Sequence, residues 1–564
     1  MLHSAEQASQ AALPRRTAAA TALPQCCLLP GMLYVTMEPQ PGLSLDQFHD
    51  WYNNEHGPTR LRLPHIFRNG LRYRATDGRA PRFLAAYDVE RMAHLDTETY
   101  TALRAHRSPR ETATIAQVDV TRYYFDLVEE TRGPLFRPPE QHTDAEADGA
   151  VLVSIELMTK EGVEGAEEEV LRWYGEEHVP LLSKVPGWLR TRCFRTSALE
   201  DADGKTKLLA LHEYTKENGL GGAEPKASMS TKRRVDALEK YVSSIDRRTH
   251  ELFYIFGPAP RDLGALSRLP AQAAWTSPDG QTQTIPGPDG AVITSYVTTA
   301  DGLAIPYRIE GNPSPAAPVI AFSNSLLTSL HMWDGLVALL RRHRPELRLL
   351  RLETRGRRAV PSPPAPATLA MLADDLAAVL AALRVPRLHA LVGVSMGGAT
   401  ALRFALRYPA WLERFVACDF NVASSEANTR AWKERIALAE EEGGTERLAQ
   451  ITVERWVHPS TLATKEEVVD NMVTMVGEND VRGFKFGCQA LWVYDMQSEL
   501  PKCTVPGLLV VGEADGKGTL VKAMEAFKEL VGPEGTELRI VPEAGHLPMV
   551  ENPDGFWDAV GAFL

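Results

Sequence analysis

The sequence has few cysteines, and none lies in a pattern that would hold a metal ion or a framework of disulfides. Its 564 residues include six cysteines, widely separated except for Cys26 and Cys27, with no C-x-x-C spacing. Structural zinc sites and small disulfide-rich domains need closely spaced cysteines. The pattern therefore indicates reduced thiols, no metal site and a cytoplasmic protein.

The sequence also lacks a long apolar run and a cluster of basic residues. A membrane-spanning helix needs about 20 consecutive apolar residues, so we expect no membrane partner. The formal net charge is −12, from 61 Lys and Arg against 73 Asp and Glu. Phosphate backbones repel such a chain, which disfavours nucleic acid as a partner. The 44% of hydrophobic residues is typical of a folded chain rather than a disordered one.

The length exceeds one ordinary hydrophobic core and suggests about three or four domains of roughly 150 residues each. Residues 1–30 are rich in Ala, Ser and Gln and contain two adjacent arginines, without the apolar core of a secretory signal. We expect them to form a disordered tail. A basic organelle-targeting peptide is the alternative.

One motif occurs twice in the first half of the chain, at a constant offset of 122 residues. The first copy reads Trp-Tyr-Asn-Asn-Glu-His-Gly-Pro at residues 51–58, and the second reads Trp-Tyr-Gly-Glu-Glu-His-Val-Pro at 173–180. A second proline follows in register, at Pro64 and Pro186. This agreement without a gap indicates an internal duplication.

The residues around the motif repeat as well. An apolar, strand-like run precedes each copy, and the motif closes an amphipathic helix that should end near its proline. Two more strand candidates, a helical stretch and a final aromatic strand then follow. The candidate strands are 32–37, 70–73, 83–89 and 123–128 in the first copy and 151–157, 188–194, 208–214 and 252–256 in the second. The order β-α-β-β-α-β is that of a ferredoxin-like fold.

The duplicated W-Y-x-x-E-H-x-P motif resembles the EthD-type branch of the dimeric α+β barrel family, in which two such sheets pack face to face. The resemblance implies that repeats at residues 31–135 and 148–257 form one α+β barrel within the chain. His56 and His178 are candidates for a second site, as general bases on a substrate in this barrel. Alternatively, the Glu and His of each motif tie the helix end to the sheet.

A stretch rich in proline, glycine and polar residues at 258–290 is typical of a linker. From residue 291 to 564, short apolar runs alternate with helical patterns. The runs lie at 319–322, 347–352, 388–392, 415–417 and 508–511. This alternation predicts an α/β domain with a mostly parallel sheet covered by helices.

The sharpest chemical signal is Gly-Val-Ser-Met-Gly-Gly at residues 393–398, between an apolar run and a helical pattern. This G-x-S-x-G motif in its strand-to-helix context is the nucleophile elbow of α/β-hydrolases. Glycine neighbours leave room for the sharp turn that holds the serine at strained backbone angles. Ser395 is therefore the predicted nucleophile.

An α/β-hydrolase nucleophile needs an acid and then a base later in the chain. Asp515 follows a late apolar strand, and His546 lies in a loop before the last helix. His546 would take the proton of Ser395 and return it to the leaving group, while Asp515 would orient and stabilise the imidazole. Glu513 and Asp419 are the alternatives for the acid.

The segment Ser-Asn-Ser-Leu at 323–326, with Met-Trp-Asp at 332–334, Thr-Arg-Gly at 354–356 and the serine motif, resembles the 3-oxoadipate enol-lactone hydrolase family. The resemblance covers about residues 292–564. It implies hydrolysis of a small lactone ester without a metal or organic cofactor, with N–H donors to the oxyanion at Leu326 and Met396. Two departures border the pocket entrance. The family's usual glycine is Leu327 here, and its Arg-Gly-His-Gly reads Arg-Gly-Arg-Arg at 355–358.

Residues 422–500 should form a helical lid over the nucleophile. Trp432 and Trp456 would line an apolar cavity, and Arg435 would hold an anionic group of the substrate. The alternative for these side chains is packing within the lid or a solvated charge.

The predicted fold class is thus α+β and α/β: tandem ferredoxin-like repeats that form an α+β barrel, followed by an α/β-hydrolase domain. The predicted function is a serine hydrolase for a small-molecule ester or lactone. A barrel that performs a non-hydrolytic ring reaction (isomerisation, decarboxylation or dehydration) is one alternative, and a barrel that serves only as an oligomerisation scaffold is another. A homo-oligomer is a further expectation.

Overall fold

The computed structural model describes residues 29–199, 207–287, 290–357, 360 and 365–564. The tail expected at residues 1–30 lies almost wholly outside the described residues, as does Arg358. No helix in the described part of the chain has the length and apolar character to cross a membrane.

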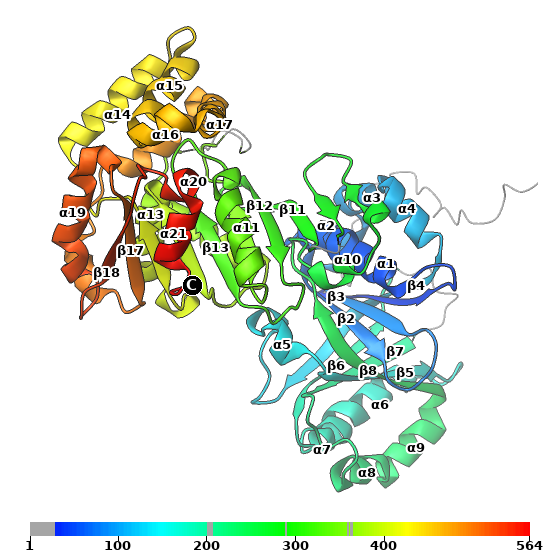
Figure 1. Cartoon of the computed structure of the whole chain (residues 1–564). Coiled ribbons are helices and arrows are strands. Elements are labelled where there is room, and N and C mark those ends of the chain that lie inside the picture. Colours follow the sequence, from blue (N-terminus) through cyan, green and yellow to red (C-terminus); the bar gives the residue numbers. More distant parts are fainter. Residues whose placement is uncertain (1–28, 200–206, 288–289, 358–359, 361–364) are drawn as a thin grey trace, which may run out of the picture.

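Eight strands of the first half close into one barrel, drawn in blue to green in Figure 1. The order around the barrel is β1-β3-β2-β8-β5-β7-β6-β4, so each half contributes four adjacent strands. The candidate strands of the sequence lie in these strands, to within one residue. The strands are β1 (Gly31–Pro39), β2 (Phe67–Ala75), β3 (Phe83–Val89), β4 (Val118–Arg132), β5 (Val151–Thr159), β6 (Trp188–Thr196), β7 (Lys207–Tyr214) and β8 (Val242–Ile255).

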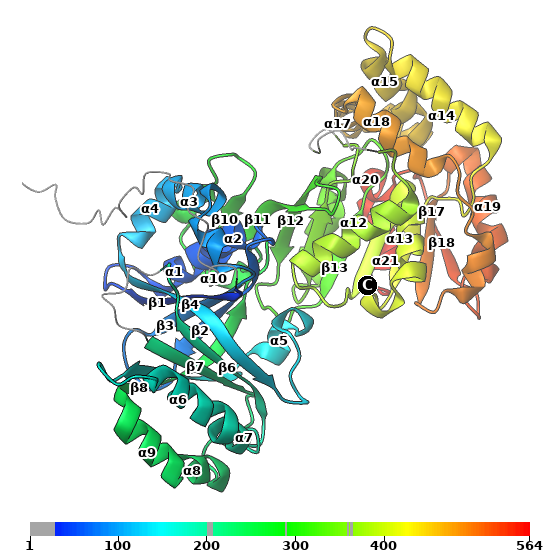
Figure 2. The ribbon, with the colours of Figure 1, turned by 180° about the vertical axis from the view of Figure 1, so that it is seen from behind.

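Apolar side chains fill the barrel, and helices cover its outside. Met32, Tyr34 and Phe125 belong to the cluster inside the strands. Separate clusters lie between the strands and the helices of each half, around Phe48 in the first and Val170 in the second. Figures 1 and 2 show these helices on opposite sides of the barrel. The helices are α1 (Leu45–Trp51), α2 (Gly57–Leu61), α3 (Glu98–Ala105), α4 (Pro109–Ile115), α5 (Asp144–Ala147), α6 (Ala166–Trp173), α7 (Val179–Leu182), α8 (Ala223–Met229) and α9 (Lys232–Tyr241).

Each motif helix ends near its proline as expected, at Leu61 shortly after Pro58 and at Leu182 shortly after Pro180, but it contains a π-turn that was not expected. A π-helical turn, Tyr52–His56 or Tyr174–His178, follows α1 and α6, and an α-helical turn follows that. In the first copy the Gly57 N–H bonds the Tyr52 carbonyl five residues back. Pro58 then lies in the first turn of α2, where a missing N–H breaks no hydrogen bond. The π-turn therefore lets the helix pass the proline.

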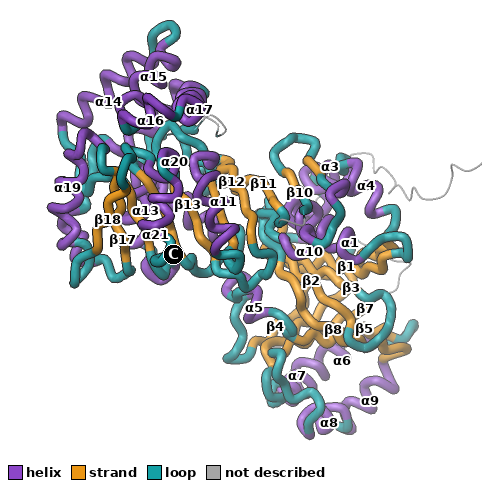
Figure 3. Tube along the Cα trace, viewed as in Figure 1, coloured by secondary structure: helices purple, strands orange, loops and turns teal. Residues whose placement is uncertain are grey.

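The second half forms a ten-stranded sheet (Figure 3), in the order β18-β17-β16-β15-β13-β14-β12-β11-β10-β9. Strands β13 to β18 pair in parallel with one another, and the remaining neighbours are antiparallel. The strands are β9 (Trp275–Thr276), β10 (Gln283–Ile285), β11 (Val292–Thr298), β12 (Ala304–Gly311), β13 (Val319–Ser323), β14 (Arg348–Leu352), β15 (Ala390–Val394), β16 (Phe415–Cys418), β17 (Gly507–Gly512) and β18 (Glu537–Val541).

Helices lie on both faces of this sheet: α11 and α21 are in front of it in Figure 1, and α12 and α13 in Figure 2. A group of helices at residues 426–487 rises above one edge, where the lid was expected. The helices are α11 (Asp334–His343), α12 (Leu369–Ala382), α13 (Met396–Arg407), α14 (Glu426–Ala439), α15 (Gly444–Trp456), α16 (Pro459–Thr464), α17 (Glu466–Gly477), α18 (Val481–Gly487), α19 (Thr519–Phe527), α20 (Pro548–Glu551) and α21 (Pro553–Val560).

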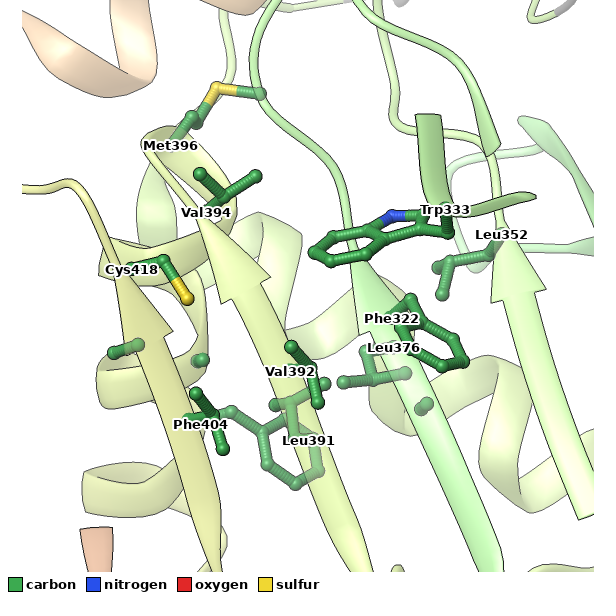
Figure 4. Packing of buried hydrophobic residues seen from close by; sticks show 14 of the residues in the cluster. Phe322, Trp333, Leu352, Leu376, Leu391, Val392, Val394, Met396, Phe404 and Cys418 are labelled. Atoms are coloured by element: carbon green, nitrogen blue, oxygen red, sulfur yellow. The ribbon is translucent and has the colours of Figure 1, made fainter. Parts of the chain in front are cut away.

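Figure 4 shows the core beneath the serine motif. Val392 and Val394 of β15 are fully buried, and Phe322 packs against Trp333 with ring centroids 5.1 Å apart. A strand that is apolar on both faces needs this cover from helices on each side. The strand that leads to Ser395 is therefore held rigidly.

The expected linker contains ordered structure. Helix α10 (Leu263–Ser267) and strands β9 and β10 lie within it, and Leu263 and Leu266 are fully buried in the core cluster of the second half. The Asp262 carboxylate accepts a hydrogen bond of 2.6 Å from the amide of Asn53 in the barrel. Arg261 and Arg384 both pair with Asp144 of α5. This segment thus contacts both halves.

Candidate functional site

The predicted hydrolase residues gather at one edge of the ten-stranded sheet. Ser395 directly follows β15, Asp515 lies three residues beyond β17, and His546 lies five residues beyond β18. The Leu326 segment follows β13. Because the carboxyl ends of parallel strands meet at the same edge, four segments far apart in the sequence come together there.

The serine motif has the geometry that its glycines predict. Ser395 has φ 58° and ψ −119°, outside the regions that most residues adopt. A Cβ atom on Gly393 would lie 2.0 Å from the Gly397 carbonyl oxygen, and one on Gly397 would lie 2.0 Å from the Ser323 carbonyl oxygen. The Ser395 N–H donates to the Cys418 carbonyl at 2.8 Å. Close backbone packing thus holds the strained serine at the N-terminus of α13.

The predicted acid and base are in contact. His546 Nδ1 lies 2.8 Å from Asp515 Oδ2, and Asp515 is only 8% exposed. The hydrogen bond leaves Nε2 of the imidazole as the nitrogen that can accept a proton. A carboxylate in this position fixes the tautomer of the ring and stabilises it once protonated.

Of the two alternative acids, one is exposed and the other is buried. Glu513 is exposed, and its carboxylate accepts a hydrogen bond from the Glu543 N–H. Asp419 is 1% exposed, and burial together with the nearby Asp515 charge raises its pKa well above its usual range. Ligand atoms of Asp419, Asp515 and His546 lie within 4.8 Å of one another, a spacing that a metal ion could use. The short Asp515–His546 hydrogen bond and the raised pKa of Asp419 favour proton transfer over metal binding.

The two predicted oxyanion donors are free to bind a ligand. Within the described residues, the N–H groups of Leu326 and Met396 form no hydrogen bond. The neighbouring Asn324 anchors this segment, since its amide donates to the Leu352 carbonyl and its oxygen accepts from the Trp333 indole. Two backbone donors beside the nucleophile are the arrangement that stabilises a tetrahedral oxyanion.

The two departures from the enol-lactone hydrolase pattern lie in contact. Leu327 has φ 67°, the left-handed conformation that explains a glycine at this position. The Arg357 guanidinium donates to the Leu327 carbonyl at 3.2 Å and to the Met475 carbonyl of α17 at 2.9 Å. Asn479 donates to the same Leu327 carbonyl. Arg357 therefore joins the strained loop to the lid.

The expected substrate contact Trp456 packs against His546. Its ring stacks on the His546 imidazole, with ring centroids 5.4 Å apart, and its backbone carbonyl accepts a hydrogen bond of 2.7 Å from the backbone N–H of His546. Sequence reasoning missed Glu551, which is 1% exposed and accepts the N–H groups of Gly545 and His458. A carboxylate in the apolar turn 548–551 was the signal that could have found it. Both residues position the His546 loop.

The other two expected substrate contacts form a pair in the lid. The Arg435 guanidinium lies 4.5 Å from the centre of the Trp432 ring, and both side chains are half-buried. Burial and the charge of Arg455 lower the pKa of Arg435 to about 10. Within the described residues, Arg435 forms no ion pair. This cation is thus available to an anionic ligand.

The motif histidines of the barrel have different surroundings. His56 Nδ1 lies 2.8 Å from Glu111 Oε1, which fits the structural interpretation of the motif. His178 Nδ1 has no hydrogen-bond partner within the described residues, although the side chain is buried. The structure brings the two histidines into separate halves of the barrel, each between a sheet and its helices.

Comparisons with known proteins match the second half. A model of the alpha/beta hydrolase family matches residues 327–559. The chain is 28% identical over 266 residues to 3-oxoadipate enol-lactonase 2 of Acinetobacter baylyi, covering 47% of this chain and 95% of that protein. It is 30% identical over 258 residues to RutD of Yersinia enterocolitica, covering 44% and 88%. An enol-lactonase structure from Burkholderia xenovorans is 29% identical with a TM-score of 0.43, covering 48% and 98%.

The two relatives have the names of hydrolytic enzymes, an enol-lactonase and a carbamate hydrolase. The matched regions span nearly the whole length of those proteins but only about half of this chain. The chain is therefore an enzyme that belongs, through its second half, to the alpha/beta hydrolase family.

Proposed function

We propose that this enzyme is a serine hydrolase that cleaves a carboxylic ester or a lactone, with Ser395 as nucleophile, His546 as base and Asp515 as orienting acid. The hydrogen bond of 2.8 Å between His546 and Asp515, at the same edge of the sheet as the strained Ser395, carries the proposal. These residue types in this chain order are the requirement for nucleophilic acyl transfer.

In the first step His546 Nε2 accepts the Ser395 proton as Oγ attacks the carbonyl carbon. The oxyanion that forms is stabilised by the N–H groups of Leu326 and Met396. Collapse of this intermediate expels the alcohol, to which His546 returns the proton, and leaves an acyl-enzyme. Water then attacks the acyl group with the same base, which releases the acid and restores Ser395. With a lactone the alcohol and the acid are parts of one product.

The substrate we propose carries a negative charge near its ester bond, as 3-oxoadipate enol-lactone does. Arg435, stacked on Trp432 and without a carboxylate partner among the described residues, supports binding of a carboxylate. The name of the Acinetobacter relative supports the same substrate class. Trp456 would shield the base from water through its stacking on His546.

For the first half we propose EthD-type ferredoxin-like repeats at residues 31–135 and 148–257, joined by residues 258–290 to the hydrolase domain at 291–564. The strand orders β4-β1-β3-β2 and β8-β5-β7-β6 support this assignment. A homo-oligomer stays a prediction. The cavity of about 410 Å³ beside His178 favours the barrel as a second catalytic unit over a passive scaffold.

The test is turnover of 3-oxoadipate enol-lactone and a panel of activated esters by the wild type beside Ser395→Ala. We expect turnover by the wild type, its loss in the variant, and covalent labelling of Ser395 by a fluorophosphonate. An absence of both wild-type turnover and labelling would contradict the proposal.

A further inference from the structure

The space between sheet and helices is filled in the first repeat and open in the second. Beside His56 the cavity measures only about 10 Å³. The equivalent cavity beside His178 measures about 410 Å³ and lies between the sheet and helices α6 to α9 at the lower end of the molecule in Figure 1. This difference arises inside one duplicated fold, so it reflects particular side chains.

Four replacements distinguish the open cavity from its filled counterpart. Tyr87 and His212 occupy the same position in their repeats, because each pairs with the third residue of the first strand of its own repeat, β1 or β5. The residue four after the motif histidine changes from Arg60 to Leu182, and the third residue of α3 or α8 changes from Tyr100 to Pro225. Glu111 and Arg234 are also equivalent, because the backbone N–H of each donates to the side chain of the residue that caps its helix, and the side chain changes from Glu to Arg. The three replacements other than Glu111 to Arg234 put a smaller side chain in the second repeat.

The smaller side chains leave buried polar atoms without partners. His178 Nδ1 and His212 Nε2 have no hydrogen bond within the described residues, although these side chains are at most 5% exposed. In the first repeat His56 is bonded to Glu111, and the Tyr87 hydroxyl donates to that of Tyr52. Buried polar groups in native proteins are nearly always paired, so these two atoms point to a ligand.

The charge around the cavity favours an anion. Lys226, Arg234 and Arg247 line it, together with a majority of apolar side chains and no Asp or Glu. Within the described residues none of these three cations forms an ion pair. Met229 and Ile245, each 45% exposed, form an apolar rim toward solvent. An apolar body with one negative group would match both features.

The two imidazoles offer a proton acceptor and a proton donor. Burial lowers the pKa of His178 to about 4 and that of His212 to about 3, so both are neutral at pH 7. Thr191 Oγ1 accepts the indole N–H of Trp188 and lies 2.9 Å from His212 Nδ1. If this hydroxyl donates to Nδ1, the His212 proton lies on Nε2, facing the cavity. The ring centroids of His178 and His212 are 6.1 Å apart, which leaves room for a ligand group at both.

We propose that the second repeat alone holds a binding site for a small aromatic or alicyclic monocarboxylate, contacted by His178 and His212, and that the first repeat is its filled, structural counterpart. The site is independent of Ser395 and of the hydrolase proposal.

The test is calorimetric titration of the full chain with 2-naphthoate and, as a neutral isostere, 2-naphthamide, after Ser395 is blocked with a fluorophosphonate. We expect one 2-naphthoate per chain, bound at least about tenfold more tightly than the amide. The double variant Leu182→Arg/His212→Tyr restores two first-repeat residues and should abolish binding. Tyr87→Phe is the matched control in the first repeat and should bind as the wild type does.

His178→Phe serves as a second variant in case the double variant fails to fold, and it should weaken binding at least about tenfold. Near-ultraviolet circular dichroism and ester turnover, measured before blocking, report folding of each variant. The proposal is overturned if 2-naphthoate shows no saturable binding up to about 1 mM, or if the folded double variant binds it unchanged. Equal affinity for 2-naphthamide would also overturn it.

Discussion

The substitution Asp515→Asn tests the acid of the proposed catalytic set. Its carboxylate contacts His546 at 2.8 Å, so the two charge centres are about 4 Å apart when the imidazole is protonated. At an effective dielectric constant of about 20 their attraction is about 4 kcal/mol. Loss of that attraction alone lowers the rate about 10³-fold, since about 1.4 kcal/mol corresponds to a factor of ten.

The amide adds a second effect. An Asn side chain can donate to His546 Nδ1, which moves the ring proton to Nε2 and removes the acceptor that Ser395 needs. The expected loss in kcat is therefore about 10³- to 10⁴-fold, with KM little changed. Stopped-flow turnover of p-nitrophenyl acetate and of the lactone measures both constants.

The matched control is Asp419→Asn. Burial and the Asp515 charge raise the pKa of Asp419, which disfavours its charged form, so the amide is a close match to the native side chain. We expect kcat to fall by less than about tenfold. Equal losses in the two variants, or an active Asp515→Asn enzyme, would refute the assignment of the acid.

Three further results are expected. Gly397→Ala places a Cβ 2.0 Å from the Ser323 carbonyl oxygen and should lower the free energy of unfolding by at least about 3 kcal/mol in urea titrations, and an unchanged midpoint would contradict the close packing. His250 is 2% exposed with its pKa lowered by burial to about 4, so the unfolded chain binds its proton first as the pH falls below about 6.5. His250→Phe should therefore reduce the loss of stability between pH 7 and pH 5 by about 1.8 kcal/mol, and a pH profile parallel to that of the wild type would argue against a neutral buried imidazole. Arg435→Ala should raise KM at least about tenfold for the lactone carboxylate while leaving that for p-nitrophenyl acetate unchanged, and equal changes for both substrates would indicate a packing role.

Many of the candidate residues at the carboxyl edge of the ten-stranded sheet could be predicted, because they lie in local sequence motifs. Ser395 needs particular glycines on both sides, and Asp515 and His546 follow strands that are recognisable as apolar runs. The supporting contacts could not be predicted in the same way. Glu551 leaves only one local sign, a carboxylate in an apolar turn, and its bond to the His458 N–H spans distant segments. Arg357 reaches a carbonyl thirty residues away and leaves no local pattern.

In the barrel, the repeat predicted the strand segments but not the difference between its two copies. The motif shows His56 and His178 as equivalent, whereas their surroundings depend on residues such as Tyr87 and His212 that lie on other strands. The helix was expected to end near its proline, and it does, but the π-turn before the proline could not be predicted, because composition gives no sign of it.

The segment between the two halves limits how this enzyme can be taken apart. Leu263 and Leu266 complete the core of the hydrolase half, while Asp262 binds the barrel residue Asn53. A fragment that starts at residue 290 would lose part of its own core, and a fragment that ends at residue 257 would lose the partner of Asn53. The segment is thus a structural part of both units rather than a flexible linker. A fragment boundary chosen from composition alone would remove contacts that both units need.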